Sequence, residues 1–299
     1  EMTVALHHVF DSPVDKIIFD VSHQTYIHKM LTGRQKAFID PKHYDDVSGY
    51  TNPKESEHDL FTIGHTSTSL SLASGILHAR DLKNEKSNVV AITGDGALSG
   101  GMAYEGLNTI ATLGTNAIII INDNDQSIAK NPKGGIYTAL ESLRETKGQA
   151  TNNIFKALGY DYHYLEDGNN LEELISLFKE VKDIDHPVVL HIYTEKGKGF
   201  EPAERNHEKF HTGGPFSLET GEYIKKGAVS ETYNSITSEY LAKKINEDPL
   251  AVVINAGTPG IVFNKKLREQ LGSQFVDVGI GEEQAVTMTT GLAKNGAKP

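Results

Sequence analysis

The amino-acid sequence predicts an α/β protein whose helices cover both faces of a doubly wound, mostly parallel sheet. Short, continuous apolar runs rich in Ile and Val are typical of strands that are buried on both faces of such a sheet. Segments with apolar residues at helical spacing separate most of these runs. Gly, Asn, Ser or Thr follows each run, at the point where a strand would end and a turn would begin.

The apolar runs and the helical segments give the expected order of the elements. Strands are expected over residues 16–21, 88–93, 117–121, 188–193 and 251–254. Helices are expected over residues 66–83, 97–113, 170–184 and 231–246. In the last of these helices, Tyr233, Ile236, Tyr240 and Leu241 form the apolar face that we expect to be buried.

The composition excludes several classes of protein. Of the 299 residues, 38% are hydrophobic and 23% are charged, as in ordinary globular proteins, and the length suggests two domains. The absence of cysteine rules out disulfides, thiolate metal sites and cysteine nucleophiles. The longest aliphatic run, 117–121, is too short to cross a membrane, and a net charge of −11 without a basic cluster argues against nucleic-acid or membrane partners. We expect a soluble, cytoplasmic protein.

Two domains are expected, over residues 1–225 and residues 230–299. The sequence begins at Glu1 inside a helical pattern, and Gly291 to Pro299 follow shortly after a helix starts, with no closing element. We therefore interpret the first domain as N-terminally truncated and the second as the incomplete start of a domain.

The strongest chemical signal is a pair of polar turns that follow the second and third expected strands. Gly94-Asp95-Gly96 lies between a strand and a helix, where glycines allow a sharp turn and a helix N-terminus can bind an anion. Asp95 and Asn124 supply hard oxygen ligands, which favour Mg²⁺ or Ca²⁺ over zinc or copper. Gly-Asp-Gly alone is more often a plain turn, but the pair at this spacing favours a cation that binds a diphosphate.

Other motifs are weaker. Ser99 occupies the place of the third glycine in a dinucleotide-binding fingerprint, and no phosphate-binding loop ends in Gly-Lys-Ser or Gly-Lys-Thr. The segment His207-Glu208-Lys209-Phe210-His211 matches a zinc-hydrolase pattern. Pro202 before it and Gly213-Gly214-Pro215 after it disfavour the helix that such a site needs, so we do not expect a zinc hydrolase.

At the two polar turns, the sequence resembles the thiamine-diphosphate-dependent enzymes of the transketolase superfamily, and among them the 1-deoxy-D-xylulose-5-phosphate synthase family. The resemblance extends over nearly the whole chain and is carried by several stretches in the same order. These stretches cover residues 19–24, 26, 28–29, 31–34, 64–69, 94–105, 122–128, 196–204, 210–211, 277–282 and 285–288. The resemblance implies the family's thiamine-diphosphate-binding fold, with a diphosphate-binding domain followed by a pyrimidine-binding domain.

The resemblance also implies how the cofactor would be held. Asp95, Asn124 and the backbone carbonyl of Gln126 would bind Mg²⁺, while Gly96, Ala97 and Asn124 would bind the diphosphate. Further residues would line the cofactor near its reacting end or lie against it; they are His23, Gly64, His65, Thr66 and Phe200, the last standing where the family usually has Tyr.

Glu282 would be the glutamate that contacts the aminopyrimidine ring of the cofactor, and with His23 it forms the expected catalytic pair. It follows an expected strand over residues 275–278 and opens the next helix. A helix N-terminus favours the charged carboxylate, whereas an apolar pocket favours the neutral acid. Taken alone, a glutamate in the first turn of a helix is explained by the helix dipole.

The reaction implied by the resemblance is the condensation of pyruvate, with loss of CO₂, and D-glyceraldehyde 3-phosphate to 1-deoxy-D-xylulose 5-phosphate. This transferase would use thiamine diphosphate and Mg²⁺ and would serve isoprene and thiamine biosynthesis. The resemblance also implies a homodimer.

Three departures from the family pattern leave alternatives open. Glu283-Gln284 replaces the usual Gln-His after Glu282, the segment between Ile128 and Phe155 is shorter than usual, and Ser22 replaces a usual Gly before His23. One alternative is a transketolase-like enzyme with a different ketose or 2-oxo acid donor. The other is a non-catalytic thiamine-diphosphate-binding paralogue.

Overall fold

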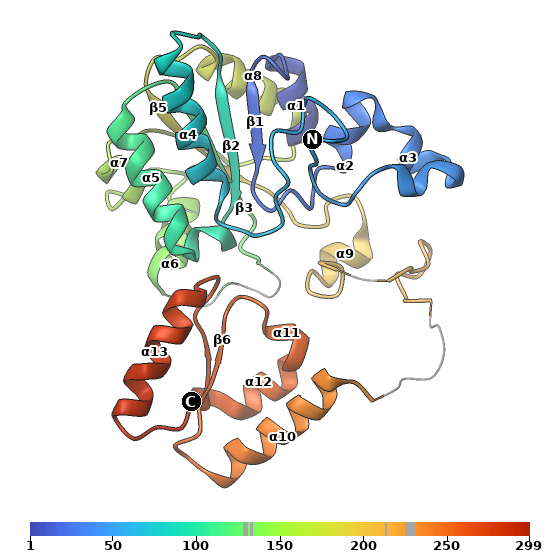
Figure 1. Cartoon of the computed structure of the whole chain (residues 1–299), viewed down its shortest axis with the longest axis vertical. Helices are drawn as coiled ribbons and strands as arrows, with labels where there is room; N and C mark the ends of the chain where they lie inside the picture. The colour runs from blue at the N-terminus through green and yellow to red at the C-terminus, as the bar shows by residue number, and fades with distance from the viewer. Residues whose placement is uncertain (128–130, 132–133, 213, 225–230) are drawn as a thin grey trace. The chain divides into compact units, whose positions relative to one another are not determined.

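The computed structural model describes residues 1–127, 131, 134–212, 214–224 and 231–299 (Figure 1). The chain forms two compact units, which are described separately below. The first unit comprises residues 1–125 and 133–195, and the second comprises residues 126–132 and 196–299. The domain limits expected from the sequence, 1–225 and 230–299, remain a prediction, and the interval between them lies outside the described residues.

The first unit is built on a parallel sheet of five strands in the order β1-β2-β3-β5-β4. The strands are β1 (Lys16–Phe19), β2 (Val89–Gly94), β3 (Ala117–Asp123), β4 (Asp161–Leu165) and β5 (Pro187–Tyr193). The α/β fold class with a parallel sheet is thereby confirmed. Because the sheet is parallel, the carboxyl ends of all its strands lie at the same edge.

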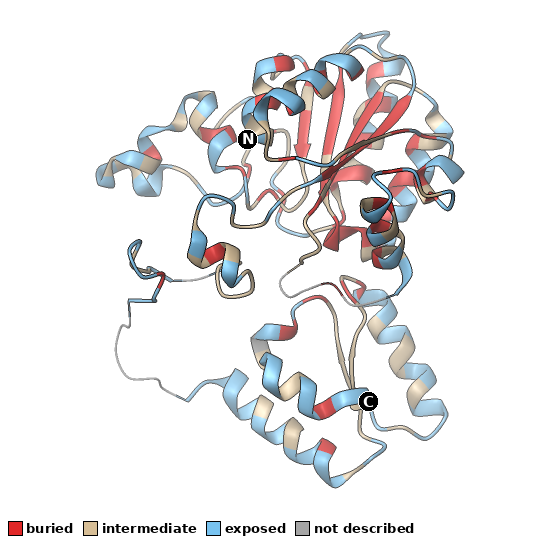
Figure 2. Ribbon diagram, turned by 180° about the vertical axis from the view of Figure 1, so that it is seen from behind, coloured by how far each residue is buried: buried red, intermediate tan, exposed pale blue. Residues whose placement is uncertain are grey.

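Helices pack on both faces of this sheet, and the strands between them are mostly buried (Figure 2). The longer helices of the unit are α1 (Met2–Val9), α4 (Ser69–Leu82), α5 (Gly101–Leu113), α6 (Gly135–Glu145) and α8 (Leu171–Val181). Short helical segments complete it: α2 (Tyr26–Lys29), a π-helical turn (Met30–Arg34), α3 (Lys36–Ile39), 3₁₀ turns (Pro41–Asp46 and Gly96–Ser99) and α7 (Ile154–Ala157).

The alternation of side chains along β3 explains the two-sided core. Ile119 and Ile121 pack in the cluster that includes residues of α4, α5 and α6. Ile118 and Ile120 pack in the cluster that includes residues of α1 and α8. Successive strand residues point to opposite faces, so a continuous Ile run forms a strand that is covered on both sides.

Several features of the first unit differ from expectation, and among them is helix α6, which was not expected from the sequence. Strand β4 was not expected, because the exposed Asp161 and the partly exposed His163 interrupt its apolar pattern at the edge of the sheet. The expected helix over 97–113 is divided into a 3₁₀ turn and α5, since Gly100 adopts an extended conformation. Glycine has a low helix propensity, and Gly100 and Gly101 follow one another at this break.

The second unit has its own two-stranded parallel sheet and small core. Its strands are β6 (Val253–Asn255) and β7 (Phe275–Asp277), and its helical segments are α9 (Glu201–Arg205), α10 (Tyr233–Glu247), α11 (Pro259–Val262), α12 (Lys265–Leu271), a 3₁₀ turn (Gly272–Gln274) and α13 (Glu282–Lys294). Ile245, Phe263 and Leu271 form the buried core.

Two expectations for the second unit are corrected. The apolar face expected on α10 is mostly exposed: Tyr233 is 90% and Tyr240 57% exposed. Of the expected residues, Leu241 does pack against the core of this unit, beside Ile245, which was not expected there. Residues after Gly291 do not follow a helix that has just begun. They complete the last turn of α13, after which Lys298 exchanges backbone hydrogen bonds with Leu250 and Val252.

A buried polar network joins α1 to the segment between β1 and α4. His7 Nε2 lies 2.9 Å from His28 Nδ1, and His28 Nε2 lies 3.0 Å from Asp59 Oδ1. Arg34 donates hydrogen bonds to both Asp59 oxygens, at 2.7 and 2.8 Å. Burial, followed by the charges of His28 and His58, lowers the pKa of His7 to about 4.

We expect the protein to lose stability as the pH falls from 6.5 toward 4, in part because of His7. In the unfolded chain His7 takes up a proton near its ordinary pKa of 6.5, whereas in the folded chain it stays neutral down to about 4. Protonation in this window therefore favours the unfolded state. Urea unfolding across the window should show a smaller loss for His7→Gln than for the wild type, and an unchanged loss for the exposed His8→Gln. Equal losses for wild type and His7→Gln would contradict this role.

Candidate functional site

The carboxyl ends of four neighbouring strands, β1, β2, β3 and β5, carry the polar residues singled out in the sequence. Gly94 at the end of β2 pairs with Asn122 of β3, and the Asp95 backbone N–H donates to the Asn122 carbonyl at 3.2 Å. Asn124 follows two residues after Asn122. The strand register therefore brings Asp95 and Asn124 to the same edge of the sheet, as the strand-end argument predicts.

The donor set at this edge fits a hard divalent cation. The Asp95 side chain is buried, and Asn124 is half-buried at the end of the next strand. A carboxylate, an amide oxygen and nearby backbone carbonyls are the ligands that Mg²⁺ prefers. In the described part of the chain, no three His, Cys, Asp or Glu residues cluster as a metal site, so a site here would rely on amide, backbone and ligand oxygens as well as Asp95.

The helix start expected after Asp95 takes a different form. Residues Gly96–Ser99 make a 3₁₀ turn, and the longer α5 begins only at Gly101. An anion at Gly96 and Ala97 would therefore meet the backbone of a tight turn rather than the N-terminus of a long helix.

The Gly64-His65-Thr66 turn is held against this edge by Asp20, the residue after β1. The Asp20 carboxylate accepts hydrogen bonds from the backbone N–H groups of Ser67, Thr68 and Ser69, at 2.8 to 3.0 Å, and from the Thr66 hydroxyl at 3.1 Å. These groups form the start of α4, where a carboxylate also meets the positive end of the helix dipole. This role of Asp20 was not expected from the sequence.

Ser67 connects this turn to the Gly-Asp-Gly turn. Its hydroxyl donates a buried hydrogen bond to the Ala97 carbonyl at 2.8 Å, and its backbone is left-handed, with φ +67°. His65 Nδ1 lies 2.7 Å from the Thr66 carbonyl. The structure thus brings the expected cofactor residues Gly64, His65 and Thr66 next to Gly96 and Ala97.

We expect Asp20→Asn to destabilise the protein by about 1–3 kcal/mol, because the amide keeps one acceptor oxygen where two oxygens now serve four donors. Asp40→Asn is the matched control. Asp40 caps a short 3₁₀ turn through one hydrogen bond to the Lys42 N–H, and asparagine caps equally well. Urea unfolding measures both changes, and an Asp20→Asn variant as stable as Asp40→Asn would refute the role given to Asp20.

His23 lies in a loop whose backbone is unusual. Val21 and Ser22 both have left-handed backbones, with φ +57° and +67°. The Ser22 hydroxyl donates to the Ile63 carbonyl at 3.0 Å and accepts from the Thr51 N–H at 3.0 Å, which ties the loop to the residue before Gly64. Glycine would adopt the left-handed backbone at Ser22 more readily than serine does.

Asp123, between Asn122 and Asn124, is completely buried in a charged cluster. Burial alone would raise the pKa of its carboxyl, but hydrogen bonds and charges from His191 and Arg144 bring that pKa below its ordinary value. Burial likewise opposes the charge of Arg144, while Asp123, Asp125 and Asp95 raise the pKa of its guanidinium. Carboxylate and guanidinium therefore both stay charged, and no sequence pattern pointed to this pairing.

Gln126, Phe200 and Glu282 belong to the second unit, and their expected roles remain predictions. Phe200 packs against the rings of Phe210 and Phe216 at centroid distances of 5.6 and 5.5 Å. Glu282 is the first residue of α13, as expected.

The segment that matched a zinc-hydrolase pattern does not form the required helix. Residues 207–210 make a turn after α9 ends at Arg205. Glu208 pairs with Arg268 at 3.3 Å, and His211 Nδ1 lies 3.0 Å from Lys196 Nζ. The expectation that this segment does not form the helix of a zinc-hydrolase motif is therefore confirmed.

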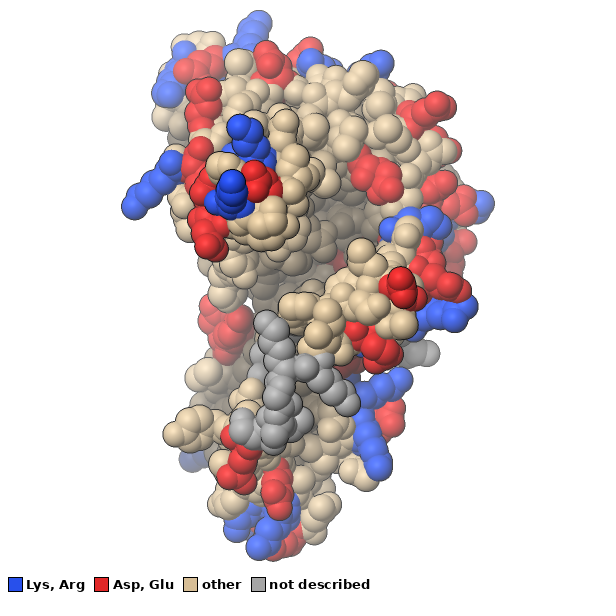
Figure 3. All heavy atoms as spheres, turned by 90° about the vertical axis from the view of Figure 1, so that its right-hand side faces the viewer, with Lys and Arg blue, Asp and Glu red and all other residues tan. Residues whose placement is uncertain are grey.

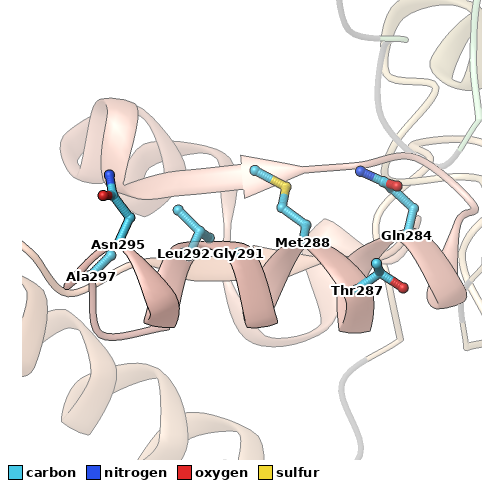
Figure 4. A pocket seen from close by; sticks show the side chains of 7 residues that line it. All are labelled: Gln284, Thr287, Met288, Gly291, Leu292, Asn295 and Ala297. Atoms are coloured by element: carbon cyan, nitrogen blue, oxygen red, sulfur yellow. The ribbon is translucent and has the colours of Figure 1, made fainter.

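The surface of the described residues shows mixed charge and one shallow hollow. On the face drawn in Figure 3, Asp and Glu side chains are interspersed with Lys and Arg over the described residues. A shallow hollow of about 400 Å³ lies along α13 (Figure 4). Its lining residues are uncharged and do not include Glu282; they are Gln284, Thr287, Met288, Gly291, Leu292, Asn295 and Ala297.

Over the described residues, no helix has both the length and the apolar character needed to cross a membrane.

The sequence is similar to one protein family over most of its length. The family model described as 1-deoxy-D-xylulose-5-phosphate synthase matches residues 1–152 and 141–194. Proteins with that name from Listeria monocytogenes, Clostridium acetobutylicum and Caldanaerobacter subterraneus are 42%, 41% and 40% identical to the chain, over its whole length. The chain covers 50%, 54% and 53% of these relatives, so it spans about half of their length.

Proposed function

Since this chain belongs to the 1-deoxy-D-xylulose-5-phosphate synthase family, we propose that the complete protein condenses pyruvate, with release of CO₂, and D-glyceraldehyde 3-phosphate to 1-deoxy-D-xylulose 5-phosphate. It is then a transferase of the thiamine-diphosphate-dependent, transketolase type, which acts in isoprene and thiamine biosynthesis. The observation that carries the proposal is the placement of Asp95 and Asn124 just after the ends of the adjacent strands β2 and β3, beside the turns at 64–66 and 96–97.

In this proposal the first unit holds the polar end of thiamine diphosphate. Asp95 and Asn124, with the backbone carbonyl of Gln126, bind Mg²⁺, and Gly96 and Ala97 bind the diphosphate. The cation offsets the negative charge that a chain with a net charge of −11 would otherwise present to the diphosphate. When bound, thiamine diphosphate supplies the carbon nucleophile that adds to the donor carbonyl.

The reacting end of the cofactor is assigned to His23, Gly64, His65, Thr66, Phe200 and Glu282. Asp20 fixes the 64–66 turn, and the Ser22 hydroxyl fixes the loop that carries His23. Glu282 exchanges a proton with the aminopyrimidine ring, and Phe200 lies against the cofactor. The active protein is a homodimer, as the family resemblance implies, and it is cytoplasmic, as its composition predicts.

The test is an assay of the complete protein with thiamine diphosphate and Mg²⁺. With pyruvate and D-glyceraldehyde 3-phosphate, we expect release of CO₂ and formation of 1-deoxy-D-xylulose 5-phosphate. Sugar phosphate made from xylulose 5-phosphate, with no product from pyruvate, would instead indicate a transketolase-like enzyme. The departure from the family pattern at Glu283-Gln284 would then be a candidate cause of the different donor. Cofactor binding without any turnover would indicate a non-catalytic paralogue.

A further inference from the structure

The turn that presents Asn124 is held on both sides by one arginine of α6. Arg144 Nη1 donates to the two oxygens of Asp123, at 2.9 and 2.7 Å, and Arg144 Nη2 donates to Asp125 Oδ1 at 3.2 Å. Asp123 and Asp125 are the neighbours of Asn124 in the chain. A planar guanidinium with several donors can bridge two carboxylates in this way, whereas an ammonium group cannot reproduce the fork.

The backbone of this turn needs such support. Asp125 has a left-handed backbone, with φ +57°, a conformation that aspartate adopts more readily than most residues when its backbone and side chain are hydrogen-bonded locally. The Asp125 N–H donates to Asp123 Oδ1 at 3.1 Å. The turn is therefore stabilised by this hydrogen bond within it and by the hydrogen bonds that Arg144 of α6 donates to both carboxylates. Because Asn124 lies between Asp123 and Asp125, the position and direction of its side chain depend on the conformation of this turn.

Asp123 is in turn anchored to the sheet. Its Oδ2 lies 2.7 Å from His191 Nε2 on β5, and His191 Nδ1 lies 2.8 Å from the Tyr162 hydroxyl on β4. Asp123 and His191 are completely buried, and Tyr162 is nearly so. The chain of contacts therefore extends from the edge strand of the sheet to the turn that contains Asn124.

Helix α6 also contacts the other half of the candidate cation site. The Tyr137 hydroxyl lies 3.4 Å from the Gly96 carbonyl, in the turn that follows Asp95. One helix thus touches both turns from which the cation ligands are expected. The buried charged cluster of Asp123, His191 and Arg144 is not explained by stability alone, because well-packed apolar residues in its place would stabilise the fold at least as much.

We propose that Arg144 is a positioning residue for the divalent cation: by joining Asp123 to Asp125, it holds the Asn124 amide oxygen where the cation can bind it. This inference rests on the proposed function, since it requires Mg²⁺ at Asp95 and Asn124. Residues that orient metal ligands commonly change metal affinity about 10–100-fold when they are replaced.

The experiment measures the Mg²⁺ concentration that half-saturates thiamine diphosphate binding, by calorimetry on the complete protein. Arg144→Lys keeps the charge but loses the fork, and we expect it to raise that concentration about 10–100-fold. Arg80→Lys is the matched control. Arg80 is also nearly buried and has several hydrogen bonds, to Ser87, Asn116 and Thr115, which precede β2 and β3 at the opposite edge of the sheet. We expect its Mg²⁺ dependence to stay within about twofold of the wild type.

Asp125→Asn is a second variant in case Arg144→Lys does not fold. The Asp125 side chain is 29% exposed, so the change should be tolerated, and it removes the carboxylate charge of Asp125 while the ion pair between Arg144 and Asp123 remains. It should raise the half-saturating Mg²⁺ concentration in the same direction, by a smaller factor. An unchanged Mg²⁺ dependence in a folded Arg144→Lys or Asp125→Asn protein overturns the inference, as does an equal change in Arg80→Lys. Absence of Mg²⁺-dependent cofactor binding by the wild type instead refutes the proposed function.

Discussion

Replacement of Asp95 by Asn is expected to weaken Mg²⁺-dependent binding of thiamine diphosphate by about 100-fold or more, because the change removes a charged ligand itself rather than a residue that orients one. The Asp95 carboxylate is buried at the end of β2, beside the turn that carries Asn124. A neutral amide offers the cation one weaker oxygen and no charge. Calorimetric titration of the complete protein with thiamine diphosphate, with and without Mg²⁺, measures the effect.

The control for this prediction is Asp15→Asn. Asp15 is also buried, but it accepts hydrogen bonds from Asn88 at the amino end of β2, away from the candidate site. Asp15→Asn is expected to lower stability while leaving cofactor affinity within about threefold of the wild type. If Asp95→Asn binds thiamine diphosphate and Mg²⁺ as tightly as Asp15→Asn, the assignment of Asp95 as a ligand is wrong.

Replacement of Glu282 by Gln should lower kcat by about 10²–10⁴-fold, the range of general acid–base catalysis, while cofactor binding changes far less. Glutamine keeps the size of the side chain at the start of α13 but cannot exchange a proton with the aminopyrimidine ring. The measurements are the rate of CO₂ release from pyruvate and the affinity for thiamine diphosphate.

Glu283→Gln separates this role from a general effect of charge. Glu283 shares the first turn of α13 and its favourable interaction with the helix dipole, so both variants lose the same electrostatic stabilisation. We expect Glu283→Gln to retain kcat within about fivefold of the wild type. Comparable losses in the two variants would show that Glu282 has no special place in the reaction.

Much of the fold could be predicted from the sequence, because β1, β2, β3 and β5 contain short apolar runs that are typical of strands in a sheet covered on both faces. Strand β4 could not, since its position at the sheet edge allows polar residues such as Asp161 and His163. The apolar spacing on α10 predicted burial, yet Tyr233 is 90% exposed. Spacing shows which residues share a face of a helix, but not what covers that face.

The residues of the candidate site that follow strand ends could be predicted from the sequence. The hydrogen bonds between side chains and partners far apart in the sequence could not. Asp95 and Asn124 follow apolar runs directly, so their common edge could be inferred. Asp20 binds residues near 67 and Arg144 binds Asp123, and no local pattern shows which carboxylate meets which donor. An aspartate after one strand and a Ser- and Thr-rich helix start were the available signals for Asp20.

The most direct test of the account is the position of a bound cation in crystals of the complete protein grown with thiamine diphosphate and Mn²⁺. Anomalous diffraction should place one Mn²⁺ about 2.0–2.4 Å from an Asp95 carboxylate oxygen and from the Asn124 amide oxygen, with diphosphate oxygens completing its ligands. Thiamine diphosphate bound with Mn²⁺ at a different set of side chains, or with Asp95 and Asn124 too far apart to share an ion, would contradict the account.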